Sequence, residues 1–173
     1  KQEVVRTSLV LKKVASQCPE LSFTVSKVSH VHERCYSGIH MLPNVRLTTE
    51  EASVLLQTGR AAIVTSGTAT LEAALLGVPQ VVIYKTNPLS FQIAKRILKI
   101  RYISLPNILL NRKLISELIQ GACTPGNIIR ELEELLNNDD TQKKISEGYS
   151  EISQLLGLKK ASQEAAKLIL SSS

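Results

Sequence analysis

The sequence predicts an α/β domain in which a doubly wound parallel sheet is followed by an all-helical C-terminal tail. Short apolar segments alternate with helical patterns up to about residue 105, and only helical patterns follow. The chain has 173 residues, of which 43% are hydrophobic, which suits one core and is short for two. We expect one sheet-containing domain over residues 1–140 and a helical tail over residues 141–173.

Five short apolar segments are predicted to be strands, because each has the length of a strand and is bounded by turn residues. In chain order they are 21–25, 45–48, 61–64, 80–84 and 102–105. The third is apolar throughout and the fourth is apolar after Gln80, which is typical of parallel strands buried on both faces. We expect Pro106 and Asn107 to end the fifth.

Helices are predicted where apolar residues recur with helical spacing or where capping residues mark an end. They cover 4–17, 29–38 weakly, 49–58, 68–76, 88–100, 113–120, 125–137, 141–156 and 160–170. Thr48 or Thr49 is expected to cap the third of these. Gly77 should end the helix over 68–76, and Pro125 suits the first turn of its helix.

The net charge of +6 is modest and scattered, so it indicates either a basic surface or attraction to phosphates on a nucleotide or a membrane. Aromatic residues make up only 3% of the chain. Proteins that bind single-stranded nucleic acid need stacking aromatic side chains beside their cations. The composition therefore argues against nucleic acid as a partner.

Cysteine and histidine usage indicates neither a disulfide framework nor a metal site. The three cysteines are far apart, and a reducing cytoplasm is therefore expected. His30, His32 and Cys35 lie close together but lack a fourth zinc ligand at suitable spacing. The printed residues contain no signal-peptide pattern and no apolar run near 18 residues, so we expect neither a leader nor a membrane span within them. The chain begins at Lys1, and we expect its natural N-terminus to lie upstream.

The most informative stretch is the turn between the strand at 61–64 and the helix at 68–76. Ligands of open parallel sheets bind beyond the carboxyl ends of the strands. Gly67 leaves room for a phosphate at the helix N-terminus, and Ser66, Thr68 and Thr70 offer hydroxyl donors. Glu72, one turn further, could accept hydrogen bonds from the two hydroxyls of a ribose. An ordinary capped turn with Glu72 on a solvated face explains the pattern equally well.

Several motifs resemble those of lipid A disaccharide synthases. They are TSGTATLEA at 65–73, VPQVVIY at 78–84, KTNP at 85–88 with Phe91 and AKR at 94–96, YISLPN at 102–107, and LIQ with CTP between 118 and 125. The resemblance covers nearly the whole chain and is strongest from 61 to 125. The specific feature is SGTATLEA together with SLPN at this separation.

The resemblance implies the C-terminal, donor-binding half of a glycosyltransferase with two Rossmann-like halves, the GT-B fold of family 19. Such enzymes transfer 2,3-diacylglucosamine from UDP to 2,3-diacylglucosamine 1-phosphate, with inversion, in the lipid A (lipopolysaccharide) biosynthesis of Gram-negative bacteria. The resemblance implies that the donor-binding half binds UDP-2,3-diacylglucosamine and that the other half binds the acylated glucosamine 1-phosphate acceptor. No cofactor is implied, and no Asp-x-Asp metal motif is present.

The resemblance also implies roles for single residues. The UDP diphosphate would contact Ser66, Gly67 and Thr68, with the Thr70 hydroxyl as a further hydrogen-bond donor. The ribose would contact Glu72, and Asn107 would lie near the donor substrate. For Asn107, a role as a turn residue after Pro106 remains open. Residues 1–3 resemble the spacer and glutamate that follow the family's Gly-Ser-Arg phosphate loop. We therefore expect that loop and its strand upstream, no catalytic residue in this chain, and no activity from it alone. Residues 26–43 fit the family poorly.

Two alternatives remain beside this interpretation. One is half of another UDP-GlcNAc-type transferase or epimerase, against which the SLPN motif argues. The other is a non-catalytic nucleotide-binding scaffold domain. The segment 88–100 is predicted to be a basic amphipathic helix, which would either pack with a solvated basic edge or touch an anionic membrane. The expected location is the cytoplasm, with peripheral contact to the inner membrane as the further possibility.

Overall fold

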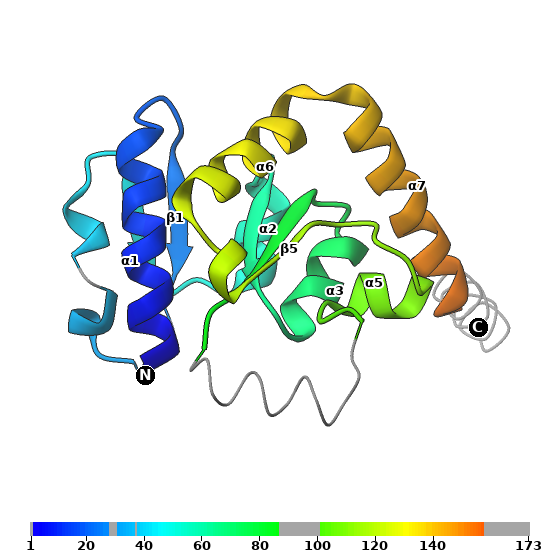
Figure 1. Ribbon diagram of the computed structural model, residues 1–173, viewed down its shortest axis with the longest axis horizontal. Coiled ribbons are helices and arrows are strands. Elements are labelled where there is room, and N and C mark those ends of the chain that lie inside the picture. The colour runs from blue at the N-terminus through cyan, green and yellow to red at the C-terminus, as the bar shows by residue number, and fades with distance from the viewer. Residues whose placement is uncertain (1, 28–30, 37, 87–100, 158–173) are drawn as a thin grey trace, which may run out of the picture.

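The computed structural model describes residues 2–27, 31–36, 38–86 and 101–157, and its strands form parallel sheets (Figure 1). β1 (Phe23–Ser26) pairs with β2 (Val45–Thr48). β4 (Gln80–Tyr84) lies between β3 (Ala62–Thr65) and β5 (Glu117–Ile119). Each pairing is parallel, so the predicted α/β class with parallel strands is confirmed.

The helices cover the strands and tie distant parts of the chain together. They are α1 (Gln2–Gln17), α2 (Ala52–Thr58), α3 (Thr68–Leu75), α5 (Leu105–Leu110), α6 (Pro125–Asn137) and α7 (Asp139–Leu155). Short 3-10 turns occupy Glu33–Tyr36, Ile39–Met41 and Gln120–Ala122. α1 contacts α6, and α3 contacts both α5 and α7. In Figure 1, α3 and α5 lie side by side near the lower end of the sheet.

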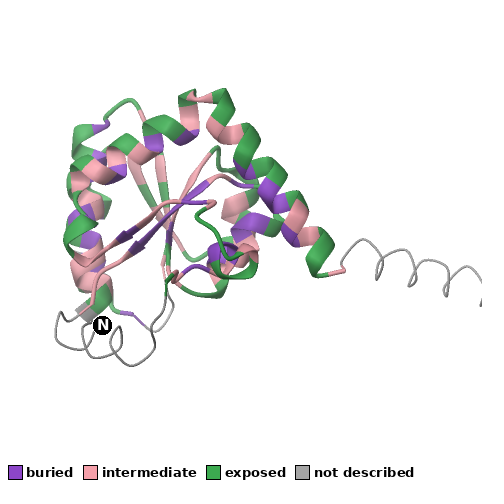
Figure 2. Ribbon diagram, turned by 45° about the vertical axis from the view of Figure 1, so that its right-hand side comes forward, coloured by how far each residue is buried: buried purple, intermediate pink, exposed green. Residues whose placement is uncertain are grey.

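The core is aliphatic, as the low aromatic content predicts. Val81, Val82 and Ile83 of β4 are at most 1% exposed, and Ile128 of α6 and Ile152 of α7 are fully buried. Figure 2 shows these buried strands at the centre of the molecule with the helices around them. Burial on both faces explains why residues 81–83 of this strand are consecutive apolar residues rather than alternating with polar ones.

Two of the predicted elements are wrong. Residues 102–105 do not form a strand, because Ser104 is the N-cap of α5 and Pro106 lies in its first turn. Residues 113–120 do not form a helix, because 117–119 pair with β4 as β5. In the first case Pro106 begins a helix rather than ending a strand, because proline is favoured in the first helical turn.

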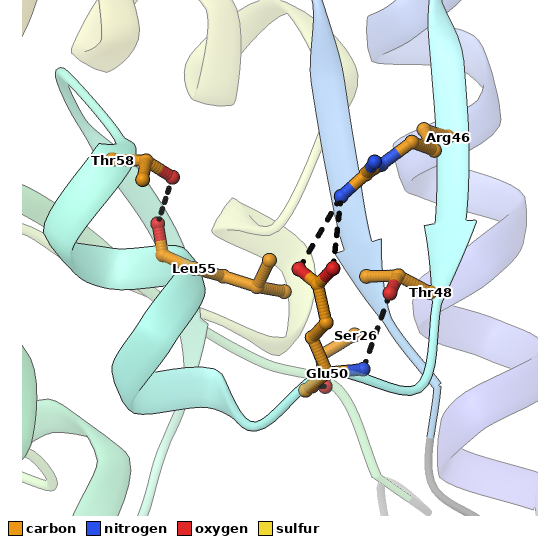
Figure 3. Close-up of polar contacts among 6 residues, drawn as sticks. All are labelled: Ser26, Arg46, Thr48, Glu50, Leu55 and Thr58. Atoms are coloured by element: carbon orange, nitrogen blue, oxygen red, sulfur yellow. Dashed lines mark hydrogen bonds and ion pairs between the residues drawn. The ribbon is translucent and has the colours of Figure 1, made fainter.

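The loop from β2 to α2 is fixed by contacts other than the predicted cap. The N-cap of α2 is Glu51, and no side chain caps the helix, so the expectation for Thr48 or Thr49 is wrong. Thr48 Oγ1 instead accepts the Glu50 N–H at 3.1 Å, and Ser26 Oγ donates to the Glu50 carbonyl at 3.1 Å (Figure 3). The exposed Arg46 Nη2 lies 3.3 Å from Glu50 Oε2. The carboxyl ends of β1 and β2 are thereby joined.

Of the other expected helix features, the end of α3 can be compared with the structure, whereas two of the expected helices cannot. Gly77 follows α3 with φ 74°, the left-handed conformation expected of a residue just past a helix end. The expected helices over 88–100 and 160–170 lie outside the described residues. Within the described residues, no helix is both long and apolar enough to span a membrane.

Candidate functional site

The turn from β3 to α3 lies at the carboxyl edge of the three-stranded sheet. The Ser66 N–H still donates to the Ile83 carbonyl at 3.3 Å, so the turn begins where the ladder ends. Gly67 has φ 145°, a conformation that residues with a side chain rarely adopt. A Cβ built on Gly67 would meet no atom of the described residues within 4 Å. Among these residues, the space beside this backbone is therefore open to a ligand.

No side chain in the described part of the chain caps the N-terminus of α3. Its N-cap residue is Gly67, which has no side-chain acceptor, and the Gly67 carbonyl accepts only the Thr70 N–H at 3.2 Å, which leaves the N–H groups of Thr68 and Ala69. Such groups lack intrahelical partners and carry the partial positive charge of the helix dipole. Thr68, the first residue of α3, is exposed. An anion such as a phosphate would complete the hydrogen bonding of this helix end.

The hydroxyls of Ser66 and Thr70 are engaged by the protein itself. Ser66 Oγ donates to the Ile103 carbonyl at 2.9 Å. Thr70 is fully buried, and its Oγ1 donates to the Gly67 carbonyl at 2.7 Å and accepts the Leu105 N–H at 3.2 Å. The structure thus places Thr70 behind the turn rather than on its open side. Main-chain N–H groups and Thr68 remain for a ligand.

Glu72 lies on the same side of α3 as Thr68, because residues four apart in a helix are neighbours. Both line a shallow groove of about 460 Å³ together with Ser53 of α2 and the leucines of α3. No hydrogen bond or ion pair joins the Glu72 carboxylate to another described residue. The carboxylate is therefore available to a ligand that extends from the turn into this groove.

A larger hollow lies away from the sheet edge, where α6 meets α7. Its volume is about 710 Å³, and its lining includes Glu133, Glu134, Asp139 and Asp140. Four carboxylates would repel a phosphate, whereas an uncapped helix N-terminus attracts one. The smaller groove beside α3 is for this reason the better candidate site.

Asn107 is fully buried in α5, and its amide bonds to the protein on both sides. Oδ1 accepts the N–H groups of Leu114 at 2.8 Å and Ile115 at 3.0 Å. Nδ2 donates to the Ile115 carbonyl and to Glu117 Oε1, both at 2.9 Å. The structure therefore places Asn107 inside the chain, where it orders the connection from α5 to β5.

The acceptor at the centre of these contacts is Glu117 of β5, which the sequence reasoning missed. Its carboxylate accepts the Ile103 N–H at 3.1 Å, the Ser104 N–H at 3.0 Å and the Ser104 hydroxyl at 2.6 Å, besides the Asn107 amide. We name Ile103, Ser104, Asn107 and Glu117 the Glu117 cluster. An acidic residue within a mostly apolar segment, Ile-Ser-Glu-Leu-Ile, was the available signal.

The carboxyl ends of β4 and β5 add two polar side chains to the same edge of the sheet. Lys85 follows β4, and its Nζ lies 3.4 Å from the Cys123 carbonyl. Gln120 follows β5 with a left-handed φ of 50°, and its buried Nε2 has no hydrogen-bond partner among the residues that the structure describes. Burial raises the pKa of the Cys123 thiol, which Lys85 partly opposes. A buried cysteine with a raised pKa is a poor nucleophile.

Parallel strands with a glycine-containing strand-to-helix turn at their carboxyl edge define a Rossmann-like α/β domain with a candidate anion site. The chain belongs to the lipid-A-disaccharide synthetase family, whose sequence model matches residues 1–170. This agrees with the resemblance found in the motifs of residues 65–73 and 102–107.

Curated relatives named lipid-A-disaccharide synthase come from several bacteria. The protein of Syntrophus aciditrophicus is 41% identical over 128 residues, which are 74% of this chain and 33% of that protein. That of Vibrio vulnificus is 34% identical over 163 residues, 92% of this chain and 42% of that protein. That of Rhodospirillum centenum is 32% identical over 150 residues, 85% of this chain and 37% of that protein. The chain thus spans less than half the length of these relatives.

Proposed function

We propose that this chain forms the donor-binding half of a lipid-A-disaccharide synthase and that the groove beside α3 holds the UDP moiety of UDP-2,3-diacylglucosamine. The observation that carries the proposal is the α3 N-terminus, which among the described residues is open at Gly67 and has no side-chain cap. Membership of the family supplies the substrate class.

The diphosphate would bind at the first N–H groups of α3, with the Thr68 hydroxyl as a further donor. Several donors and the helix dipole act there on the same phosphate oxygens. Ser66 and Thr70 would contribute through their own bonds to Ile103 and Leu105, which fix the shape of the turn. Asn107 is fully buried and would not contact the nucleotide, so it would contribute only by ordering the connection from α5 to β5.

The ribose would bind against Glu72. This carboxylate lies one helical turn from Thr68 and shares the groove with it. Two vicinal hydroxyls can donate to the two oxygens of one carboxylate, whereas a phosphate at that place would be repelled. The position of Glu72 thus orients the nucleotide, with its phosphates toward Gly67 and its sugar toward α2.

In the proposed transfer, the acceptor hydroxyl oxygen bonds to the anomeric carbon while the bond from that carbon to the β-phosphate oxygen breaks. The electron pair of the broken bond leaves with UDP, and the anomeric configuration inverts. N–H groups at the α3 N-terminus stabilise the negative charge that develops on the leaving diphosphate. The acceptor and the base that takes its proton would bind outside these residues, so nucleotide binding is the activity to measure.

Because the proposed substrates are acylated, the protein would work at a membrane surface, on its cytoplasmic face. The basic segment over 88–100, which lies outside the described residues, and the net charge of +6 are the features of this chain that support contact with anionic lipids.

Calorimetric titration with UDP, UMP, ADP and GDP tests the proposal. We expect UDP to bind more tightly than UMP, because the second phosphate adds contacts, and more tightly than either purine diphosphate. Glu72→Gln should raise the Kd for UDP about tenfold, since a neutral amide is a weaker acceptor for the ribose hydroxyls. Equal affinity for all four nucleotides would contradict the proposal.

Glu133→Gln is the matched control. It removes the same charge from an exposed position in the acidic hollow between α6 and α7. The Kd for UDP should be unchanged in this variant. If both variants weaken UDP equally, the effect is one of net charge, and Glu72 does not contact the ribose.

A further inference from the structure

Glu117 stands behind the proposed phosphate site rather than in it. Its half-buried carboxylate accepts four hydrogen bonds, two from consecutive main-chain N–H groups and two from side chains of the Glu117 cluster. Hydrogen bonds to an ionised acceptor are shorter and stronger than neutral ones, and the one from the Ser104 hydroxyl is 2.6 Å long. The main chain at Ile103 and Ser104 is thus held from one side by a single charge.

The same main-chain segment holds the β3–α3 turn from its other side. The Ile103 carbonyl accepts the Ser66 hydroxyl, and the Leu105 N–H donates to Thr70 Oγ1. Thr70 Oγ1 in turn donates to the carbonyl of Gly67, the N-cap of α3. A path of hydrogen bonds, linked by the main chain of residues 103–105, therefore runs from β5 to the glycine whose backbone shapes the proposed phosphate site.

We propose that Glu117 is a positioning residue for phosphate binding, which sets the orientation of the turn N–H groups through Ile103–Leu105 and the hydroxyls of Ser66 and Thr70. The inference rests on the proposed function, because it assigns Glu117 to that same site. The carboxylate cannot serve as a direct ligand, since it would repel a phosphate and its oxygens already accept four donors.

Glu117→Gln tests the assignment, because it keeps the shape of the side chain but turns one acceptor into a donor that faces other donors. We expect the Kd for UDP to rise about tenfold and amide hydrogen exchange over residues 67–69 to accelerate in the absence of ligand. Ile128→Val is the control, since it trims a fully buried side chain of α6 that takes no part in the path. Its loss of stability should leave the Kd and the exchange at 67–69 unchanged.

A double-variant comparison separates positioning from general stability. Thr70→Val removes the hydroxyl that links Leu105 to Gly67 and keeps the shape of the side chain. If Glu117 acts along this path, Glu117→Gln combined with Thr70→Val should weaken UDP binding by less than the product of the single effects. Fully multiplicative effects, or a Glu117→Gln protein that binds UDP like the Ile128→Val protein, would overturn the assignment.

Failure of the proposed function has a different signature. If the unmodified protein binds no UDP, the nucleotide assignment fails. The hydrogen-exchange comparison between Glu117→Gln and Ile128→Val then still decides whether Glu117 orders the turn. Unchanged exchange at residues 67–69 in both variants would overturn the positioning role by itself.

Discussion

At the scale of single residues, the polar side chains near the turn differ in what they are free to contact. Thr70 and Asn107 have the residue types expected of ligand contacts, yet both are fully buried and bonded to their own chain. Glu72 is the opposite case, with a carboxylate that faces a groove and has no bonded partner among the described residues. Sequence pattern shows which side chains could bind a phosphate, and burial shows which remain available.

Gly67→Ala should weaken both folding and nucleotide binding. The φ of 145° is unfavourable for alanine, so we expect a loss of about 1–2 kcal/mol in the free energy of unfolding, measured by urea denaturation. The new methyl group would meet no atom of the described residues within 4 Å, but it would occupy the space proposed for the phosphate. Loss of detectable UDP binding by a protein that is still folded is the expected result.

Gly126→Ala provides the matched control for that experiment. Gly126 lies in the first turn of α6, where an added Cβ also meets no atom within 4 Å. Because Gly126 does not have this unusual φ, alanine there should raise the free energy of unfolding by no more than about 1 kcal/mol. If Gly67→Ala binds UDP as tightly as Gly126→Ala, the phosphate does not lie against Gly67.

At the scale of elements, the sequence predicts well those that carry their own signals. β2, β4 and α6 have the predicted bounds, and for α6 the reason is local. Thr124 Oγ1 accepts the Asn127 N–H, and Pro125 takes the first helical position. The strand-to-helix turn at 65–68 was found for the same reason, since an apolar run, a glycine and hydroxyls mark it.

The elements that were missed depend on distant partners. β5 has three residues, too few to show alternation, and it is a strand because it pairs with β4. α5 has six residues, and its burial arises from contacts with α3 and α7. The Glu117 cluster joins segments that lie 10 to 14 residues apart. The spacing of apolar residues within one segment cannot predict contacts with another segment.

Gly148→Ala tests how tightly α7 is packed on the connection from α5 to β5. Gly148 is buried within α7, and an added Cβ would overlap the end of the Leu114 side chain. The gain in helix propensity, about 1 kcal/mol, should be outweighed by overpacking of about 1–3 kcal/mol. We therefore expect a lower urea midpoint.

Leu114→Ala supplies the compensating change for that test. It leaves a void when made alone, but in the double variant the alanine Cβ at position 148 partly fills it. The double variant should therefore be more stable than the sum of the single effects predicts. If the two changes in the free energy of unfolding add strictly, contact with Leu114 is not the reason why position 148 requires glycine.

At the scale of the whole molecule, α7 is bonded to the domain that carries the site. Tyr149 is 3% exposed, and its hydroxyl donates to the Val78 carbonyl at 3.2 Å and accepts Gln80 Nε2 at 3.0 Å. Gln80 Nε2 also donates to the Thr70 carbonyl in α3 at 2.8 Å. One tyrosine thus joins α7 to the start of β4 and, through Gln80, to the helix of the proposed site.

This arrangement makes stability depend on pH in the alkaline range. Burial raises the pKa of Tyr149 well above its ordinary value of about 10, and the Gln80 donor opposes this only in part. The folded protein therefore keeps the Tyr149 proton at a pH where the unfolded chain has lost it. Its contribution is complete below about pH 10 and is lost as the pH rises from there toward the raised pKa.

Tyr149→Phe isolates this contribution. At pH 8 the free energy of unfolding of the variant should be lower by about 1 kcal/mol, the value of a typical hydrogen bond. The Val78 carbonyl loses its hydrogen-bond donor, whereas Gln80 Nε2 keeps its bond to the Thr70 carbonyl. Between pH 10 and 11 the stability of the unmodified protein should fall more steeply, so the two urea-unfolding curves converge. Burial also raises the thiol pKa values of Cys18 and Cys123, but these act equally in both proteins. Parallel pH profiles would mean that Tyr149 ionises in the folded protein as readily as in the unfolded chain, and that α7 does not shield it.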